Sequence, residues 1–246
     1  MTQTMYLERF SPARWTPPWV RHQHMTRYSW VSEFARGARV IDAACGTGYG
    51  SELIARFANP TLVDGFDVST DAIAEATVKF GHVPGLSFRK ADVVSLPVDD
   101  ASYDLYVCFE TVEHVTDDRA LVAESRRVLD RNGMLVISTP NRDIVAPGTD
   151  LSHSPDNPSH VREYSVSEFV CLLSQYFSTI QLFGQSPYGT RYAEMLRLIG
   201  TISTRCALRV HQARKTCESA WRTETFHHPT GITLDRSPEI LIAVCS

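Results

Sequence analysis

Short apolar runs alternate with amphipathic stretches from about residue 31 to residue 183. The apolar runs are bounded by turn residues and predict strands at 39–43, 61–66, 86–88, 103–109 and 134–138, with later candidates at 179–183 and 239–245. Stretches with the helical spacing of apolar residues lie between them, at 50–57, 70–80, 117–129 and 165–177. This rhythm predicts an α/β fold around a mainly parallel sheet.

Polar residues mark where the predicted helices begin and end. Asp71, Asp117 and Ser165 stand where N-caps or first-turn acids belong. Asn132–Gly133 separates a helical stretch from the next apolar run, and glycine adopts a positive φ without steric cost. This pair therefore predicts a helix stop followed by a tight turn.

The length of 246 residues and the hydrophobic fraction of 43% fit a single α/β domain with a sizeable core. Three regions break the strand–helix rhythm, at 1–30, 142–164 and 184–236, and such segments usually carry the cover and the specificity of a site. We expect four parts: an N-terminal cover at 1–30, a ligand-binding core at 31–183, a substrate lid inserted at 184–236 and a final strand at 237–246.

The charge balance disfavours a nucleic-acid partner. The chain has 24 basic and 28 acidic residues, a net charge of −4, and so lacks the positive field that phosphate backbones attract. No window reaches the roughly 18 consecutive apolar residues of a membrane span, and residues 1–15 lack a signal-peptide core, so we expect a cytoplasmic protein without membrane contact. The six scattered cysteines form no Cys-x-x-Cys pair and predict no disulfide and no zinc site.

A glycine turn follows the first predicted strand and opens a helix. Gly46, Gly48 and Gly50 come shortly after Asp42, and glycines at such a turn let backbone approach a ligand closely, while the helix start offers unpaired N–H groups. The Gly-x-Gly-x-Gly spacing differs from the Gly-x-Gly-x-x-Gly of dinucleotide-binding oxidoreductases. An oxidoreductase is therefore disfavoured.

Two further carboxylates follow the next two predicted strands. Asp67 ends the second strand, where a carboxylate can accept both hydroxyls of a ribose, and Asp92 follows the third. Each one alone could be a cap or turn residue. Together with Asp42 they place three carboxylates at the carboxyl ends of consecutive strands, which favours a nucleoside site.

From residue 40 to about residue 169 the order of these motifs resembles the class I S-adenosylmethionine-dependent methyltransferases. The resemblance implies a Rossmann-like seven-stranded sheet, mostly parallel, with helices on both faces and an antiparallel last strand at 240–245. It implies S-adenosylmethionine bound over the strand tips. An N-terminal helix with His-Met-Thr-Arg-Tyr at 24–28 would lie over the cofactor, or would be a cover helix with a solvated polar face. The implied cofactor-binding residues are Asp42, Ala43, Gly46, Gly48, Asp67, Val68, Asp92, Val93, Phe109 and Arg27.

Glu110, Glu113 and His114 follow the fourth predicted strand and form a candidate catalytic cluster. Their spacing places Glu110 on one helical face with Glu113 or His114. The same Glu-x-x-Glu-His spacing resembles that of ubiquinone-biosynthesis O-methyltransferases, whose pattern implies a divalent metal such as Mg²⁺. Either a metal bound by these residues polarises an acceptor hydroxyl, or His114 alone acts as the base.

Ionisable residues also gather at 153–164, just past the fifth predicted strand. His160 is a candidate second base. Arg162 and Glu163 either hydrogen-bond sugar hydroxyls or lock the loop onto the following helix. Thr-Pro-Asn at 139–141 and His-Val-Arg-Glu-Tyr-Ser at 160–165 look like a methyltransferase subgroup that acts on saccharides and secondary metabolites.

These features predict methyl transfer from S-adenosylmethionine to a hydroxyl of a small saccharide-like or secondary-metabolite acceptor, as in antibiotic biosynthesis or sugar methylation. One alternative is N-methylation of an amino sugar. Another is a protein that binds S-adenosylmethionine without turnover. The segment 184–236 is compatible with a substrate lid or with a homodimer contact.

Overall fold

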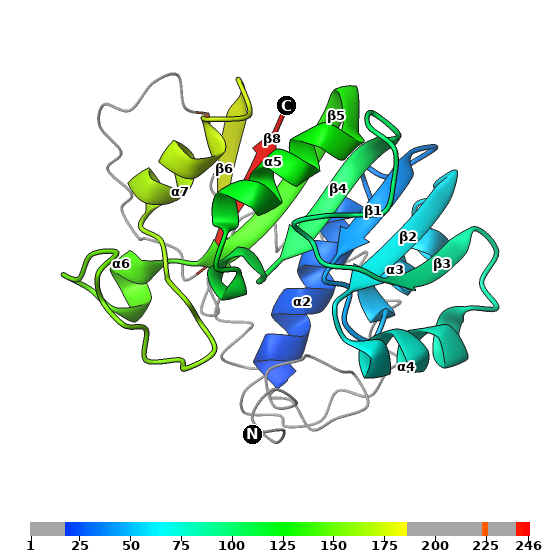
Figure 1. The fold of residues 1–246 in the computed structure, drawn as a ribbon, viewed down its shortest axis with the longest axis horizontal. Coiled ribbons are helices and arrows are strands. Elements are labelled where there is room, and N and C mark those ends of the chain that lie inside the picture. Colours follow the sequence, from blue (N-terminus) through cyan, green and yellow to red (C-terminus); the bar gives the residue numbers. More distant parts are fainter. Residues whose placement is uncertain (1–17, 186–222, 226–239) are drawn as a thin grey trace.

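A computed structural model describes residues 18–185, 223–225 and 240–246 (Figure 1). Its elements in chain order are α2 (Pro18–Val31), β1 (Arg39–Ala43), α3 (Tyr49–Phe57), β2 (Leu62–Asp67), α4 (Thr70–Phe80), β3 (Leu86–Lys90), β4 (Tyr103–Phe109), the 3-10 turn η1 (Val112–His114), α5 (Asp118–Val128), β5 (Leu129–Pro140), α6 (Arg142–Val145), α7 (Val166–Leu173), β6 (Ile180–Gln185), β7 (Thr223–Thr225) and β8 (Ile240–Cys245). The predicted order of strands and helices is confirmed.

The strands form one sheet in the order β3-β2-β1-β4-β5-β8-β6-β7. Strands β1 to β5 pair in parallel, and β8 lies antiparallel between β5 and β6. The predicted mostly parallel sheet with an antiparallel last strand is therefore confirmed. The structure adds the three-residue strand β7, which pairs antiparallel with β6 at the sheet edge.

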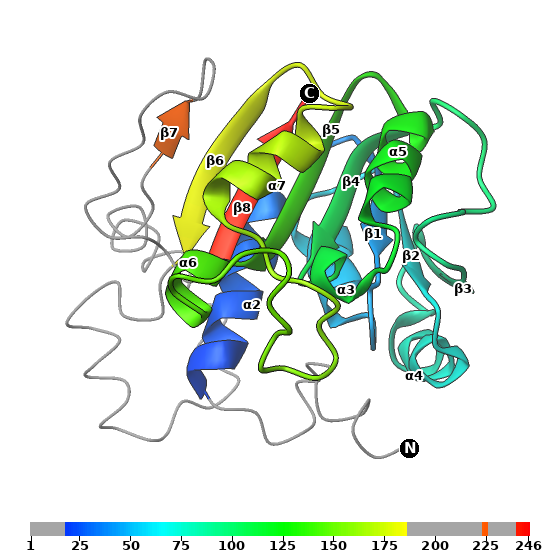
Figure 2. The same ribbon diagram turned by 60° about the vertical axis from the view of Figure 1, so that its left-hand side comes forward.

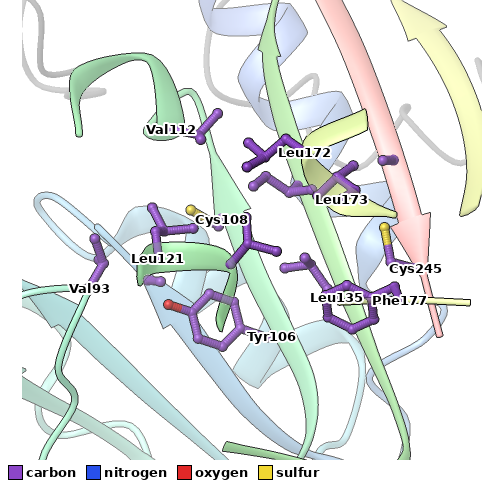
Figure 3. Close-up of a cluster of buried hydrophobic side chains, with 14 of the residues drawn as sticks. Val93, Tyr106, Cys108, Val112, Leu121, Leu135, Leu172, Leu173, Phe177 and Cys245 are labelled. Carbon is purple, nitrogen blue, oxygen red and sulfur yellow. The ribbon is translucent and has the colours of Figure 1, made fainter. Parts of the chain in front are cut away.

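Alternate residues of the central strands point to opposite faces and build two buried clusters. Tyr106 and Cys108 of β4 join a cluster with Leu121 of α5 and Leu173 of α7 (Figure 3). Leu105 and Val107 of the same strand join the other cluster, with Tyr28 and Val31 of α2 and Ile54 of α3. Figure 2 shows α5 and α7 in front of the sheet, with α2 and α3 behind it. Both faces are thus covered, as a parallel sheet requires.

The predicted helix starts are confirmed in detail. Asp117 caps α5 by accepting a hydrogen bond from the Ala120 N–H at 2.9 Å. Ser165 and Glu168 form a reciprocal capping box at the start of α7. Asp71 lies in the first turn of α4, whose N-cap is Ser69. These contacts fix where the loops at the sheet's carboxyl edge end.

The predicted turn at Asn132–Gly133 is wrong. Helix α5 ends at Val128, and strand β5 already begins at Leu129 and runs through this pair to Pro140. The pairing of β5 with β4 shifts between its first and second contacts, and Asp130 accepts a hydrogen bond from the Asn132 N–H at 2.8 Å. A strand irregularity, rather than a helix stop, accommodates these residues.

Several predictions fall on residues outside the described part of the chain. They concern residues 1–17 of the N-terminal cover and nearly all of the segment 184–236. The predicted role of that segment as a lid or a dimer contact therefore stays a prediction. In the part that the structure describes, no helix is long and apolar enough to cross a membrane. The four described cysteines, Cys45, Cys108, Cys171 and Cys245, are free thiols.

Candidate active site

Gly46 and Gly48, in the turn after β1, have different surroundings. Gly46 and Gly48 both have positive φ, 55° and 80°. A Cβ added at Gly48 would lie 2.7 Å from the Phe88 ring and 2.8 Å from the Ala76 Cβ, whereas one added at Gly46 would meet nothing within 4 Å. Gly48 therefore serves the packing of the turn against β3 and α4. Gly46 leaves open space at the turn, where a ligand can approach the backbone.

Asp67 at the end of β2 holds this turn in place. Its carboxylate accepts hydrogen bonds from the Gly46 N–H at 3.0 Å and from the Ser69 N–H at 2.8 Å. The neighbouring Val68 is exposed, and Ala43 at the end of β1 is buried. The carboxylate predicted for the ribose thus lies directly beside the open glycine turn.

Asp42 lies beneath the turn and is fully buried. One carboxylate oxygen accepts from the Tyr28 hydroxyl at 3.0 Å and the other from the Ser51 hydroxyl at 2.6 Å. Burial raises the pKa of Asp42 to about 7, although the hydrogen bonds from Ser51 and Tyr28 oppose that rise. Asp42 therefore ties the turn to helix α2, and the sequence did not indicate the two hydroxyl partners.

The third carboxylate of the predicted nucleoside site is more open. Asp92 follows β3 as an exposed residue and accepts a hydrogen bond from the Val94 N–H at 3.2 Å. Val93 beside it is buried in the cluster under α5. Because β1, β2 and β3 are parallel neighbours, Asp42, Asp67 and Asp92 all lie at one edge of the sheet.

Helix α2 is a buried cover rather than a helix with a solvated polar face. The Arg27 guanidinium is 1% exposed, donates to the Gln185 amide oxygen at 2.7 Å and lies 5.7 Å from the centre of the Phe109 ring. The Nε atom of Arg27 has no hydrogen-bond partner among the described residues. A Cβ at Gly50 would overlap the Tyr28 ring, so the third glycine of the motif admits this helix.

His24 on the same helix shares a hydrogen bond with the Tyr49 hydroxyl at 3.0 Å. Burial, assisted by the Arg27 charge, holds the pKa of His24 well below its usual value. Burial likewise raises the pKa of Tyr49. Burial therefore disfavours the charged forms of both side chains in this contact between α2 and α3. The structure thus overturns the alternative of a solvated polar face for His24 and Arg27.

The Glu-x-x-Glu-His motif does not lie on one helical face, because no α-helix forms there. Glu110 leaves β4 with a positive φ of 48°, and its N–H donates to the Ser138 carbonyl at 3.2 Å. The Ser138 hydroxyl in turn donates to the Glu110 carboxylate at 2.7 Å. Only Val112–His114 form a short 3-10 turn. This kink separates Glu110 from the two residues that it was expected to join.

Glu113 is buried against the end of β5. The Thr139 hydroxyl donates to its carboxylate at 3.1 Å, and its carbonyl accepts from the Val161 N–H at 2.7 Å. Burial, reinforced by the nearby charge of Glu110, raises the pKa of Glu113 well above its usual value. The backbone contact brings the loop 146–164 against the turn after β4.

That contact places His160 beside His114, with their ring centres 4.8 Å apart. His114 Nδ1 lies 3.0 Å from the Ser159 carbonyl, and His160 Nδ1 lies 2.8 Å from the Glu163 carboxylate. Because these oxygens only accept, the Nδ1 atom of each histidine is the donor in its hydrogen bond. Figure 1 shows this loop, between α6 and α7, at the same edge as the turns after β1 and β4.

Arg162 and Glu163 were expected either to bind sugar hydroxyls or to fix the loop, and their hydrogen bonds within the protein favour the second role. Arg162 donates to Asp118 at 2.6 Å and to the Thr116 carbonyl at 2.8 Å, while the Tyr164 hydroxyl also donates to Asp118 at 2.7 Å. Arg162 therefore locks the loop onto the start of α5. Glu163 orients His160, a role that the sequence did not indicate.

The sequence is similar to known methyltransferases. Residues 41–137 match the family described as "Methyltransferase domain". A probable S-adenosylmethionine-dependent methyltransferase of Mycobacterium tuberculosis is 36% identical over 155 residues, which are 63% of this chain and 53% of that protein. Residues 41–137 are therefore similar in sequence to S-adenosylmethionine-dependent methyltransferases. S-adenosylmethionine is the cofactor of proteins of this class.

The methyltransferase domain has further relatives with other names. A ubiquinone biosynthesis O-methyltransferase of Bordetella avium is 30% identical over 154 residues, covering 56% of this chain and 61% of that protein. The crystal structure of the cyclase SpnF superposes with a TM-score of 0.59 at 15% identity, covering 97% of this chain and 85% of that one, a likeness of fold alone. The chain spans about half the length of the curated mycobacterial relatives that it matches.

Proposed function

We propose that this protein transfers the methyl group of S-adenosylmethionine to a hydroxyl group of a small molecule, with a saccharide-like secondary metabolite as the acceptor. The observation that carries the proposal is the position of the His114 and His160 imidazole rings, whose centres lie 4.8 Å apart. They lie at the sheet edge that also holds the open glycine turn and Asp67. A proton acceptor and a nucleoside site thus share one edge.

The cofactor half of the site comprises the turns after β1, β2 and β3 with helix α2 above them. We assign the ribose to Asp67 and Val68, the adenine edge to Asp92 and Val93, and close backbone approach to Gly46. Arg27 offers a buried positive charge suited to the carboxylate of the amino-acid end of the cofactor. We assign the base of the cofactor site to four further residues: Asp42, Ala43, Gly48 and Phe109.

Bound S-adenosylmethionine supplies an electrophilic methyl carbon on a positively charged sulfur. Transfer would form a carbon–oxygen bond as the carbon–sulfur bond breaks, so the acceptor hydroxyl would have to lose its proton. We assign the removal of this proton to the His114 imidazole, whose Nδ1 donates to the Ser159 carbonyl. Glu113 and His160 lie beside His114, and we assign Glu110, which follows β4, to the same catalytic cluster. Fixing acceptor and methyl carbon in line supplies roughly 7–11 kcal/mol of the barrier reduction.

The saccharide-like acceptor is supported by two segments that resemble a sugar-methylating subgroup. Thr-Pro-Asn at 139–141 and the loop ending at Tyr164 are far apart in sequence, yet Asn141 pairs with Tyr164 and the Arg142 N–H donates to the Tyr164 carbonyl at 2.8 Å. They form one wall beside His160. We assign the segment 184–236 as the lid over this wall or as a homodimer contact.

The test is transfer of a labelled methyl group from S-adenosylmethionine to a panel of sugars, amino sugars and phenols. Label on a hydroxyl oxygen is the expected result, and label on an amine would replace the proposal by N-methylation. Cofactor binding without transfer to any class would leave a binding protein. Asp67→Ala should weaken cofactor affinity severely, whereas His114→Ala should spare it.

A further inference from the structure

Glu110, directly after β4, adopts a strained backbone conformation. Its φ of 48° lies in the left-handed region, which non-glycine residues rarely occupy, and such positions cluster at functional sites. Ser138, a buried residue of β5, holds this conformation. The Glu110 N–H donates to the Ser138 carbonyl at 3.2 Å and to its hydroxyl at 3.1 Å, and that hydroxyl donates to the Glu110 carboxylate at 2.7 Å. Ser138 therefore fixes the half-buried Glu110 carboxylate at the end of β4.

A buried charge of opposite sign lies close to this carboxylate. The Arg27 guanidinium lies 5.7 Å from the centre of the Phe109 ring, and Phe109 directly precedes Glu110. Burial raises the pKa of Glu113 and the pKa of Tyr49. For both groups the Glu110 charge adds to the rise, and the Arg27 charge opposes it. Arg27 and Glu110 therefore lie within electrostatic range of the same two side chains.

Arg27 and Glu110 nevertheless do not pair. Within residues 18–185, 223–225 and 240–246, neither side chain forms an ion pair, and the Arg27 Nε has no hydrogen-bond partner. The buried Nε2 of Gln23, one turn earlier on α2, also has no partner there. Gln185 joins the two residues, because it accepts from Arg27 at 2.7 Å and donates to the Gln23 carbonyl at 3.2 Å. Buried charges and donors are costly unless they are paired, so these groups indicate a ligand.

We infer that Glu110 binds the ammonium group of the amino-acid end of S-adenosylmethionine, while Arg27 and Gln23 bind its carboxylate. An α-amino acid carries these two opposite charges on one carbon atom, which matches an acid and a base that lie close together without pairing. The sulfonium is farther from the carboxylate than the ammonium is, so the nearby guanidinium favours the ammonium as the partner of Glu110.

The position of Glu110 suits this contact. Strands β1 and β4 are parallel neighbours, so the end of β4 lies beside the glycine turn that follows β1. That turn has open space at Gly46, where the cofactor is proposed to approach the backbone. The inference rests on the proposed cofactor site and adds Glu110 and Gln23 to it.

The experiment is calorimetric titration of the full-length protein, in EDTA, with four nucleosides. They are S-adenosylmethionine, S-adenosylhomocysteine without the sulfonium charge, decarboxylated S-adenosylmethionine, and 5′-methylthioadenosine without the amino-acid end. Glu110→Gln should weaken binding of the first three by about 10- to 100-fold, because a hydrogen bond between charged groups contributes that much, and should spare methylthioadenosine. Arg27→Gln should weaken only the two ligands that carry a carboxylate.

Two smaller effects should follow the same patterns. Ser138→Ala should repeat the Glu110→Gln pattern, and Gln23→Ala the Arg27→Gln pattern, each with a loss of about 2- to 10-fold, because a neutral hydrogen bond contributes less. A purely structural residue would weaken all four ligands alike. Glu33→Gln makes the same substitution at an exposed glutamate just after α2 and should change no affinity. Circular dichroism establishes that each variant folds.

Three results would overturn the inference. One is unchanged affinity for S-adenosylmethionine in Glu110→Gln, or an equal loss for methylthioadenosine. Another is a loss for S-adenosylmethionine but not for S-adenosylhomocysteine, which would assign Glu110 to the sulfonium. The third is a loss that appears only when Mg²⁺ replaces EDTA, which would assign the carboxylate to the metal that the sequence pattern implied. The proposed function fails separately, because these affinities are measured without an acceptor and without methyl transfer.

Discussion

The proposed cofactor half and the proposed acceptor half of the site differ in how their polar side chains are bonded. In the cofactor half, Asp42 and Asp67 are bonded to hydroxyls and backbone N–H groups of the domain itself. In the acceptor half, the Nδ1 atoms of His114 and His160 are bonded to oxygens of the loop 146–164. The first half is organised to hold its own shape, whereas the second presents reactive groups. Substitutions in the two halves should therefore affect different measurements.

The largest expected effect is on turnover in the acceptor half. His114→Ala should lower kcat by about 10²- to 10⁴-fold, because a positioned base contributes that much to proton removal. Cofactor affinity, measured by calorimetry, should stay the same. His153→Ala is the matched control. Equal turnover in both variants would reduce His114 to a structural residue and remove the distinction between the halves.

The next effect is a pH dependence located in the cofactor half. The pKa of Asp42 is raised to about 7 in the fold from 3.8 in an unfolded chain, so the folded state binds more protons between these values. Stability should therefore fall as pH rises from about 4 to 7, by up to about 4 kcal/mol. Asp42→Asn should flatten this slope in denaturant titrations at pH 5 and 7.5. If the pH dependence of stability is unchanged in Asp42→Asn, it arises from other groups, such as Glu113.

A pair of glycine variants should separate shape from ligand approach. Gly48→Ala should destabilise the fold by about 2–4 kcal/mol, combining left-handed strain with overlap against Phe88 and Ala76. Gly46→Ala should cost only the strain, about 1–2 kcal/mol, yet weaken S-adenosylmethionine binding because its methyl group enters the open space. Thermal unfolding and calorimetry measure the two effects. Equal destabilisation by both variants would contradict the separate tasks of the glycines.

The smallest effect concerns the loop lock. Arg162→Ala removes a partly exposed ion pair with Asp118 and should cost about 1 kcal/mol of unfolding free energy. Its larger effect should be a raised KM for the acceptor, because the loop carries His160. An unchanged KM, with the loss confined to stability, would mean that the lock is not needed to position the acceptor half.

The local structure around the proposed cofactor half was easier to predict from sequence than that around the proposed acceptor half, for a physical reason. The glycine turn, Asp67 and the helix caps are local, so a few neighbouring residues determine them. Helix α2 was predicted, but its burial depends on Gly50, Tyr49 and Gln185, which pack against it from distant elements. Long-range packing of this kind leaves no periodic signal in one sequence.

The acceptor half shows where reasoning from spacing fails. Glu110 adopts a positive φ that non-glycine residues rarely take, so the motif bends where a helix was expected. His160 reaches His114 through the contact of the Val161 N–H with the Glu113 carbonyl, a pairing between segments 48 residues apart. The predicted turn at Asn132–Gly133 was wrong for a similar reason, because the pairing of β5 with β4 outweighed the local preference of these residues for a turn.

The most direct test of the account is calorimetric titration of the protein and of its Gly46→Ala and His114→Ala variants with S-adenosylmethionine, with NAD as the control ligand. The account predicts one bound S-adenosylmethionine per chain, no binding of NAD, weakened binding in Gly46→Ala and unchanged binding in His114→Ala. Failure of the unmodified protein to bind S-adenosylmethionine, or equal affinity in all three proteins, would contradict it.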